Sequence, residues 1–113
     1  ASVNPSERRE EKILLIGKYQ FDQLNQVLKN DCRCIRLTIK ENTILGMLAG
    51  SANNMVKREE IMLATWGVAD YYTGRSLDVF ISKLRSYLKD DPDIKIITIP
   101  TLGYILEVTD KST

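Results

Sequence analysis

The chain has 113 residues, of which 43% are hydrophobic and 27% charged, and its formal net charge is +1. This size fits one globular domain with a modest core, packed mainly by Leu, Ile and Val because aromatic residues make up only 7%. No apolar run has transmembrane length and no signal-peptide pattern is present, so we expect a soluble, cytoplasmic protein. The near-neutral charge lacks the strong basic excess that would by itself indicate nucleic-acid binding.

The N-terminal part of the chain predicts a linker followed by a small sheet. Residues 1–12 combine Ser, Asn and Pro with a mixed-charge run and offer little to bury, which is typical of a linker. Apolar and alternating segments then predict two β-hairpins, at 13–22 and at 26–37. Together these hairpins predict a four-stranded antiparallel sheet.

Two helices are predicted next. Thr38 and Glu41 have the spacing of a capping box, in which the hydroxyl and the carboxylate each accept from a backbone N–H, so a helix starts at Thr38 and Gly50 ends it. Residues 51–54 form a loop and Met55-Val56 a short extended link. The second helix is predicted from Arg58 to Thr65.

A third helix is predicted from about Arg75 to Lys89, after a loop at 68–74. Its apolar residues recur at helical spacing and would face the core: Leu77, Ile81, Leu84 and Leu88. Strands are predicted at 94–99 and 104–108, around a turn at 100–103. Four strands, three helices and a terminal β-hairpin make an α+β fold with the outline of a winged helix.

The remaining surface of the third helix differs from an ordinary solvated face, because it carries small hydroxyls, a basic residue and apolar side chains. These residues are Ser76, Asp78, Val79, Phe80, Ser82, Lys83, Ser86 and Tyr87, with Arg85 beside them. Small side chains let a helix approach a DNA groove, a lysine or arginine donates to guanine, and apolar atoms contact the thymine methyl. The alternative is an ordinary amphipathic helix, and the helix alone does not decide between the two.

Several motifs along residues 19–107 resemble the effector domain of two-component response regulators of the OmpR/PhoB family. The motifs are Leu37-Thr38-x-x-Glu41, Val56-x-Arg58-Glu59-x-Ile61, Trp66-Gly67, Gly74-Arg75-Ser76-Leu77-Asp78-Val79-x-Ile81-Ser82-Lys83-Leu84-Arg85-x-x-Leu88, and Thr98-Ile99 with Leu102-Gly103-Tyr104. The resemblance implies a winged helix-turn-helix with an N-terminal four-stranded antiparallel sheet, three helices and a C-terminal β-hairpin wing. The third helix would enter the major groove and the wing would lie beside the minor groove.

Carried over by position, the resemblance assigns roles in DNA binding. The base-reading residues would be Val79, Lys83 and Arg85. The phosphate contacts would come from Arg58, Trp66, Arg75, Ser76, Ser82, Thr98 and Tyr104. For Trp66 and Tyr104 a core position with a polar tip is the alternative, and Asp78 is expected to hold the scaffold through a nearby arginine. The loop at 68–74 corresponds to a loop thought to contact RNA polymerase, with Asp70, Tyr71 and Tyr72 as candidates; the alternative is a packed loop.

Three positions depart from the family pattern. Phe80 stands where a polar residue or histidine is common, Lys83 replaces a more usual arginine, and Pro100 stands where the wing often carries a basic residue. A lysine is a point charge without the bidentate geometry of an arginine. We therefore expect weak DNA binding by one domain, which dimerisation on repeated half-sites would strengthen.

The resemblance also implies a longer protein. A receiver domain would precede the linker, a cognate sensor histidine kinase would control it, and the activated homodimer would bind tandem half-sites in double-stranded DNA; residues 13–109 would be the domain and 110–113 a tail. No catalysis, metal or cofactor is expected, because the C-x-C pair Cys32 and Cys34 lacks further zinc ligands in a chain without histidine. One rival is a winged helix that binds proteins through Val79, Phe80 and Tyr87; another, a small enzyme or ligand-binding domain, has no support in the sequence.

Overall fold

The computed structural model describes residues 13–109; the predicted linker at 1–12 and tail at 110–113 lie outside them. The elements in chain order are β1 (Ile13–Ile16), β2 (Tyr19–Asp22), β3 (Val27–Lys29), β4 (Cys34–Arg36), α2 (Ile39–Gly50), β5 (Met55–Lys57), α3 (Arg58–Trp66), α4 (Tyr71–Tyr87), β6 (Ile94–Ile99) and β7 (Gly103–Val108). This order confirms the predicted α+β winged-helix architecture.

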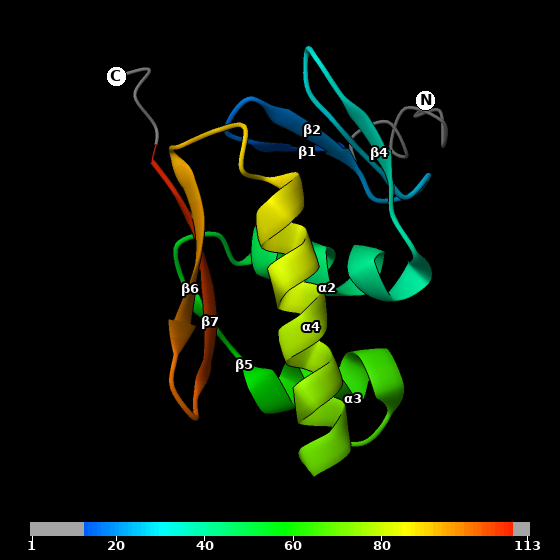
Figure 1. The fold of residues 1–113 in the computed structure, drawn as a ribbon, viewed down its shortest axis with the longest axis vertical. Helices are drawn as coiled ribbons and strands as arrows, with labels where there is room; N and C mark the ends of the chain where they lie inside the picture. Colours follow the sequence, from blue (N-terminus) through cyan, green and yellow to red (C-terminus); the bar gives the residue numbers. More distant parts are fainter. Residues whose placement is uncertain (1–12, 110–113) are drawn as a thin grey trace, which may run out of the picture.

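Two antiparallel sheets flank the helices. The four-stranded sheet has the order β1-β2-β3-β4 and lies at one end of the molecule, while the β6–β7 hairpin, the wing, runs along one side of α4 (Figure 1). The segment predicted as a mere link is a strand: β5 pairs with β7 through Met55↔Ile105, Val56↔Tyr104 and Lys57↔Gly103. The wing sheet therefore has the order β5-β7-β6, and β5 fixes the wing to the start of α3.

The capping box predicted at the start of α2 is confirmed. The backbone N–H of Glu41 donates to the Thr38 hydroxyl at 3.2 Å, and the Thr38 N–H donates to Oε1 of Glu41 at 2.9 Å. Glu41 is buried, and its second oxygen accepts from the hydroxyl of Tyr87 at 2.9 Å. A buried carboxylate is stable only when it is hydrogen-bonded, so this cap also fastens α2 to the end of α4.

The third helix, α4, begins four residues before the predicted start. The Asp70 side chain accepts from the Thr73 N–H at 2.8 Å and caps the helix, so Tyr71 and Tyr72 lie in its first turn. The prediction of a loop at 68–74 was therefore wrong for its second half. The helix also ends earlier, at Tyr87, while its apolar stripe is buried as predicted.

Hydrogen bonds fasten the four-stranded sheet to the C-terminal end of α4. The Tyr19 hydroxyl donates to the Tyr87 carbonyl at 3.0 Å and accepts from the Asp90 N–H at 3.2 Å. The buried carboxylate of Asp91, which follows α4 in the chain, accepts at 3.0 Å from the N–H of Lys18 in the β1–β2 turn. The sheet therefore braces the helix, leaving its N-terminal half free of this contact.

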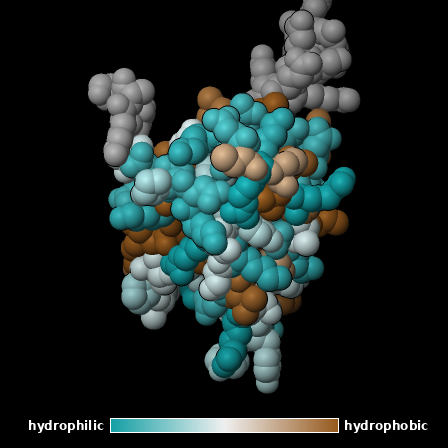
Figure 2. All heavy atoms as spheres, turned by 45° about the horizontal axis from the view of Figure 1, so that its top comes forward, coloured by the Kyte–Doolittle hydropathy of each residue, from teal (hydrophilic) through white to brown (hydrophobic). Residues whose placement is uncertain are grey.

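The surface is mainly hydrophilic where the sheet end of the molecule faces the viewer, with apolar residues in small separate patches (Figure 2). Cys32 and Cys34 are free and exposed; Cys34 begins β4 and Cys32 lies in the preceding turn. Among residues 13–109, no group of three or more His, Cys, Asp or Glu side chains is arranged to hold a metal ion. Within the same range, no helix combines the length and the apolar character needed to cross a membrane.

Candidate nucleic-acid interface

The outward face of α4 is open to solvent. Val79 is 57% exposed, and Lys83 on the next turn is exposed as well. The predicted phosphate contacts on the same helix are also exposed: Arg75, Ser76 and Ser82. Arg75 and Lys83 give this face two positive side chains beside small serines, so the face is both basic and low in bulk, as close approach to a phosphate backbone requires.

Asp78 joins α4 to the wing and to α3. The hydroxyl of Tyr104, whose side chain is only 2% exposed, donates to Oδ1 of Asp78 at 2.6 Å. A guanidinium nitrogen of Arg58 lies 3.8 Å from the same oxygen. Burial, and then the hydrogen bond and charge of Asp78, raise the pKa of Tyr104 to about 12. Tyr104 is thus a core residue whose polar tip is already occupied.

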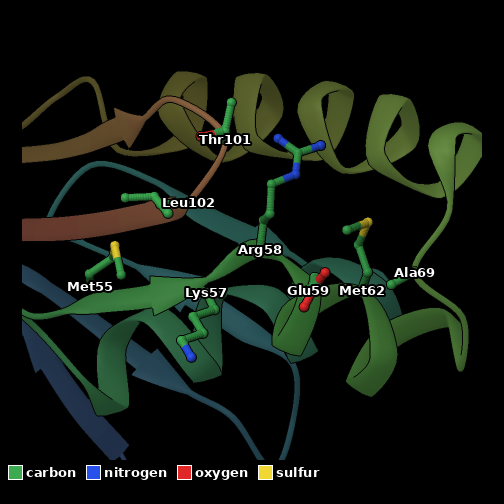
Figure 3. A pocket seen from close by; sticks show the side chains of 8 residues that line it. All are labelled: Met55, Lys57, Arg58, Glu59, Met62, Ala69, Thr101 and Leu102. Atoms are coloured by element: carbon green, nitrogen blue, oxygen red, sulfur yellow. The ribbon is translucent and has the colours of Figure 1, made fainter.

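Arg58 lies in a space that α4 leaves open. Its side chain extends from the start of α3 towards α4, beside the wing tip, and lines an open groove of about 650 Å³ (Figure 3). A Cβ atom added at Gly74 would lie 2.6 Å from a terminal nitrogen of Arg58. A glycine in the first turn of α4 therefore makes room for the guanidinium, which reaches Asp78 from that position.

Arg85 makes a second link between α4 and the wing. Its Nε and Nη2 donate to the carbonyl of Ile96 at 3.0 and 2.8 Å, and Nη2 also donates to Oγ1 of Thr98 at 2.7 Å. A planar guanidinium suits this bidentate geometry, which a lysine does not reproduce. Arg85 was expected to contact a base and Thr98 a phosphate. In the structure their side chains are hydrogen-bonded to each other.

An aromatic pair lies beside Lys83. The rings of Trp66, in the last turn of α3, and of Phe80 have centroids 5.7 Å apart and planes inclined by 57°. Both side chains are partly buried against the core. The Lys83 ammonium lies 5.6 Å from the centroid of the Phe80 ring. Trp66, Phe80 and Lys83 therefore form a continuous contact from α3 to the outward face of α4.

The first turn of α4 groups the remaining predicted residues. Arg75 donates to the Tyr71 hydroxyl at 3.0 Å and lies 5.8 Å from the centroid of that ring. Tyr71 and Tyr72 are 68% and 78% exposed and meet edge to face, with centroids 5.6 Å apart. The Asp70 carboxylate is engaged as the helix cap, and the Thr73 N–H lowers its pKa.

Comparison with known proteins decides the family. A family model described as "Transcriptional regulatory protein, C terminal" matches residues 32–106. The chain belongs to this family. Over 104 residues it is 38% identical to the transcriptional regulatory protein RprY of Bacteroides fragilis, and the matched region covers 92% of this chain and 44% of that protein. Over 98 residues it is 31% identical to the sensory transduction protein RegX3 of Mycolicibacterium smegmatis, covering 84% and 42%. The chain spans less than half the length of these relatives.

Solved structures agree with this assignment of a regulator C-terminal domain. The DNA-binding domain of CpxR from E. coli superposes with a TM-score of 0.75 at 25% identity, covering 87% of this chain and 98% of that one. The Klebsiella pneumoniae RstA DNA-binding domain, solved in complex with the RstA box, gives a TM-score of 0.71 at 26% identity, covering 85% and 97%. The response regulator DrrB of Thermotoga maritima, described as an OmpR/PhoB homolog, gives 0.70 at 28%, covering 90% and 47%.

The regulator C-terminal domain brings together most, but not all, of the residues predicted from the sequence. Five of them share the outward face of α4: Arg75, Ser76, Val79, Ser82 and Lys83. Arg58 and Thr98 flank this face, whereas Tyr104 is buried and Trp66 is partly buried. Sequence reasoning missed the role of Gly74 and the ring contact of Lys83. A glycine inside a helix-capable segment was the one available signal for the former.

Proposed function

We propose that this regulator C-terminal domain binds double-stranded DNA sequence-specifically and so controls transcription, with α4 in the major groove. The observation that carries the proposal is the exposed, basic and small-residue face of α4, with Val79 and Lys83 both outward. The wing lies next to it, tied to the helix through Arg85. Further support comes from the RstA domain, which shares the fold and was solved with its DNA box.

We assign the residues of this surface to two tasks. Val79 and Lys83 read base edges, because they are exposed on the centre of the helix. The phosphate contacts come from residues around them: Arg58, Arg75, Ser76, Ser82, Trp66 and Thr98. Phosphate contacts set the register of the protein on the duplex, while the base contacts select the sequence. We assign Arg85 and Tyr104 a supporting role instead: Arg85 holds the wing through the Ile96 carbonyl, and Tyr104 holds the Asp78 carboxylate.

The proposal extends to a longer, cytoplasmic protein that works without catalysis. A receiver domain would stand before residue 13, and its phosphorylation by a sensor histidine kinase would favour a homodimer on tandem half-sites. Tyr71 and Tyr72 would offer their exposed rings to RNA polymerase, beside the DNA-facing Arg75. Linking two modest domains on adjacent half-sites multiplies affinity without a new DNA contact.

Selection of bound sequences from a random DNA pool tests the proposal, followed by affinity measurements on the selected site. Lys83→Ala is expected to relax the preference at one base position, whereas Arg58→Ala weakens all sequences about equally. Each lowers the slope of log affinity against log salt by about one. Lys29→Ala, a matched loss of one exposed charge on β3, leaves both readouts unchanged. A pool that yields no preferred sequence, together with salt-independent binding of a protein partner, would favour the protein-interaction alternative.

A further inference from the structure

We propose that Phe80 is a positioning residue for Lys83, and that an aromatic ring at position 80 sharpens the preference of the domain for the base that Lys83 reads. The inference rests on the proposed function, because it assumes that Lys83 reads a base. In this assignment Phe80 itself contacts no DNA atom. It acts by setting the direction in which the Lys83 ammonium points.

The first step is the contact itself. Phe80 and Lys83 are three residues apart on α4, so their side chains lie on neighbouring turns of the same face. The Lys83 ammonium stands 5.6 Å from the ring centroid, within the range at which the negative face of an aromatic ring attracts a cation. Lys83 is exposed and has a long, flexible stem, so this attraction restricts where its charge can point.

The second step is the rigidity of the ring. Phe80 is partly buried against the core, and Trp66 packs on it with centroids 5.7 Å apart and planes inclined by 57°. Trp66 belongs to α3, so the plane of the Phe80 ring is set by a different helix from the one that carries it. Lys83 is therefore directed by the packing of two helices, and not by its own rotamer preference alone.

The third step concerns specificity. An ammonium group donates in several directions and, unlike a guanidinium, does not match the two acceptors of guanine as a fixed pair. A lysine that is free to swing would reach neighbouring acceptors about equally well. Holding its charge over one ring face limits the acceptors within reach, which raises discrimination between bases more than overall affinity.

A double-mutant cycle with the selected DNA site tests this inference. The proteins are wild type, Phe80→Leu, Phe80→Tyr, Lys83→Ala and the double variant Phe80→Leu with Lys83→Ala. The measured quantity is the ratio of affinities for the selected site and for the site altered at the base that Lys83→Ala identifies. Phe80→Leu should reduce this ratio about 2- to 5-fold, the size expected for an exposed cation–π contact. Phe80→Tyr keeps a ring and should retain the ratio.

Comparing Phe80→Leu in the wild-type and Lys83→Ala proteins shows whether Phe80 acts by positioning Lys83 or only by packing. In the Lys83→Ala protein, Phe80→Leu should leave the ratio unchanged, since no ammonium remains to be directed. An equal loss in both backgrounds, or a sharper preference in Phe80→Leu, would overturn the inference while leaving DNA binding intact. A wild-type protein that selects no DNA sequence would instead overturn the proposed function, and the inference with it.

A measurement without DNA gives an independent check on the same contact. The Lys83 ammonium lies over the Phe80 ring, so the NMR signals of the adjoining ε-methylene protons should be shifted upfield by the ring current in the wild-type domain. Phe80→Tyr should preserve this shift and Phe80→Leu should remove it, while the Lys29 signals serve as the unshifted reference. Lys83 signals at the position of a free lysine in the wild type would refute the positioning role, whatever the affinities show.

Discussion

Replacing Tyr104 by Phe removes one hydroxyl from the core and leaves the ring in place. In the wild type this hydroxyl donates to the Asp78 carboxylate at 2.6 Å. A hydrogen bond to a charged acceptor contributes about 1.5–3 kcal/mol when it is shielded from water. The Asp78 side chain is 61% exposed, so water replaces part of the lost bond, and we expect Tyr104→Phe to lower the unfolding free energy at pH 7 by about 1 kcal/mol.

The ionisation of the same hydroxyl makes the difference in unfolding free energy between wild type and Tyr104→Phe depend on pH. The pKa of Tyr104 rises from 10.0 to about 12 on folding, chiefly through burial and then through Asp78. Below pH 10 both states hold the proton, and the full contribution is present. Between pH 10 and 12 the unfolded chain releases it while the folded protein retains it, so unfolding becomes easier as pH rises. Two pKa units correspond to at most about 3 kcal/mol.

Urea denaturation at pH 7, 10, 11 and 11.5, followed by the fluorescence of the single tryptophan, measures both effects. Burial also raises the pKa of Tyr19 and Tyr87, but these groups are common to the two proteins and cancel in the comparison. The wild type should be the more stable protein at pH 7, and the two stability curves should converge and cross between pH 10 and 12. Curves that stay parallel would refute the assignment of Tyr104 as a buried, Asp78-bound phenol.

Three further predictions, one of them with a matched control substitution, test the fold around this surface. Gly103→Ala should lower the free energy of unfolding by about 1–3 kcal/mol, because its Cβ would lie 2.1 Å from the carbonyl oxygen of Val56. Gly50→Ala, with open space around the added Cβ, should raise it slightly. Equal effects of the two substitutions in urea denaturation would contradict this. Thr101→Gly should raise stability by up to about 1 kcal/mol, since Thr101 has a φ of 64°, and a lower melting temperature would count against strain there. Arg85→Lys should lower the stability of the DNA-free domain by about 1 kcal/mol, whereas a residue that only contacts DNA would leave it unchanged.

Features that depend on residues close in sequence were predictable. The capping box needs only Thr38 and Glu41 at the right spacing, and the apolar stripe of α4 needs only helical periodicity. The wing hairpin likewise follows from two apolar segments around a turn. In each case the physical cause lies within one element or between two neighbouring elements, so the sequence pattern carries it in full.

Features that depend on contacts between distant elements were not predictable. Gly74 fell within the predicted loop, but in the structure it lies within α4, where a larger side chain would collide with Arg58 of α3. The partner of Arg85 includes a backbone carbonyl, that of Ile96, and a carbonyl has no signature in sequence. The same holds for the Trp66–Phe80 contact, since no local pattern states which rings of two helices will meet.

The two links between α4 and the wing have a consequence for binding. Asp78 accepts from Tyr104 of β7, and Arg85 donates to Ile96 of β6, so both strands of the wing are fixed to the same helix at points about two turns apart. On the proposed function, a helix and a wing held in this way would meet the duplex at a preset spacing, which would reduce the ordering cost of association. The Lys83 ammonium instead lies over the ring of Phe80, on the same helix. On the proposed assignment, a rigid frame would contact the phosphates and one ring-directed donor would read a base, so a substitution at Phe80 would change specificity more than it changes the frame.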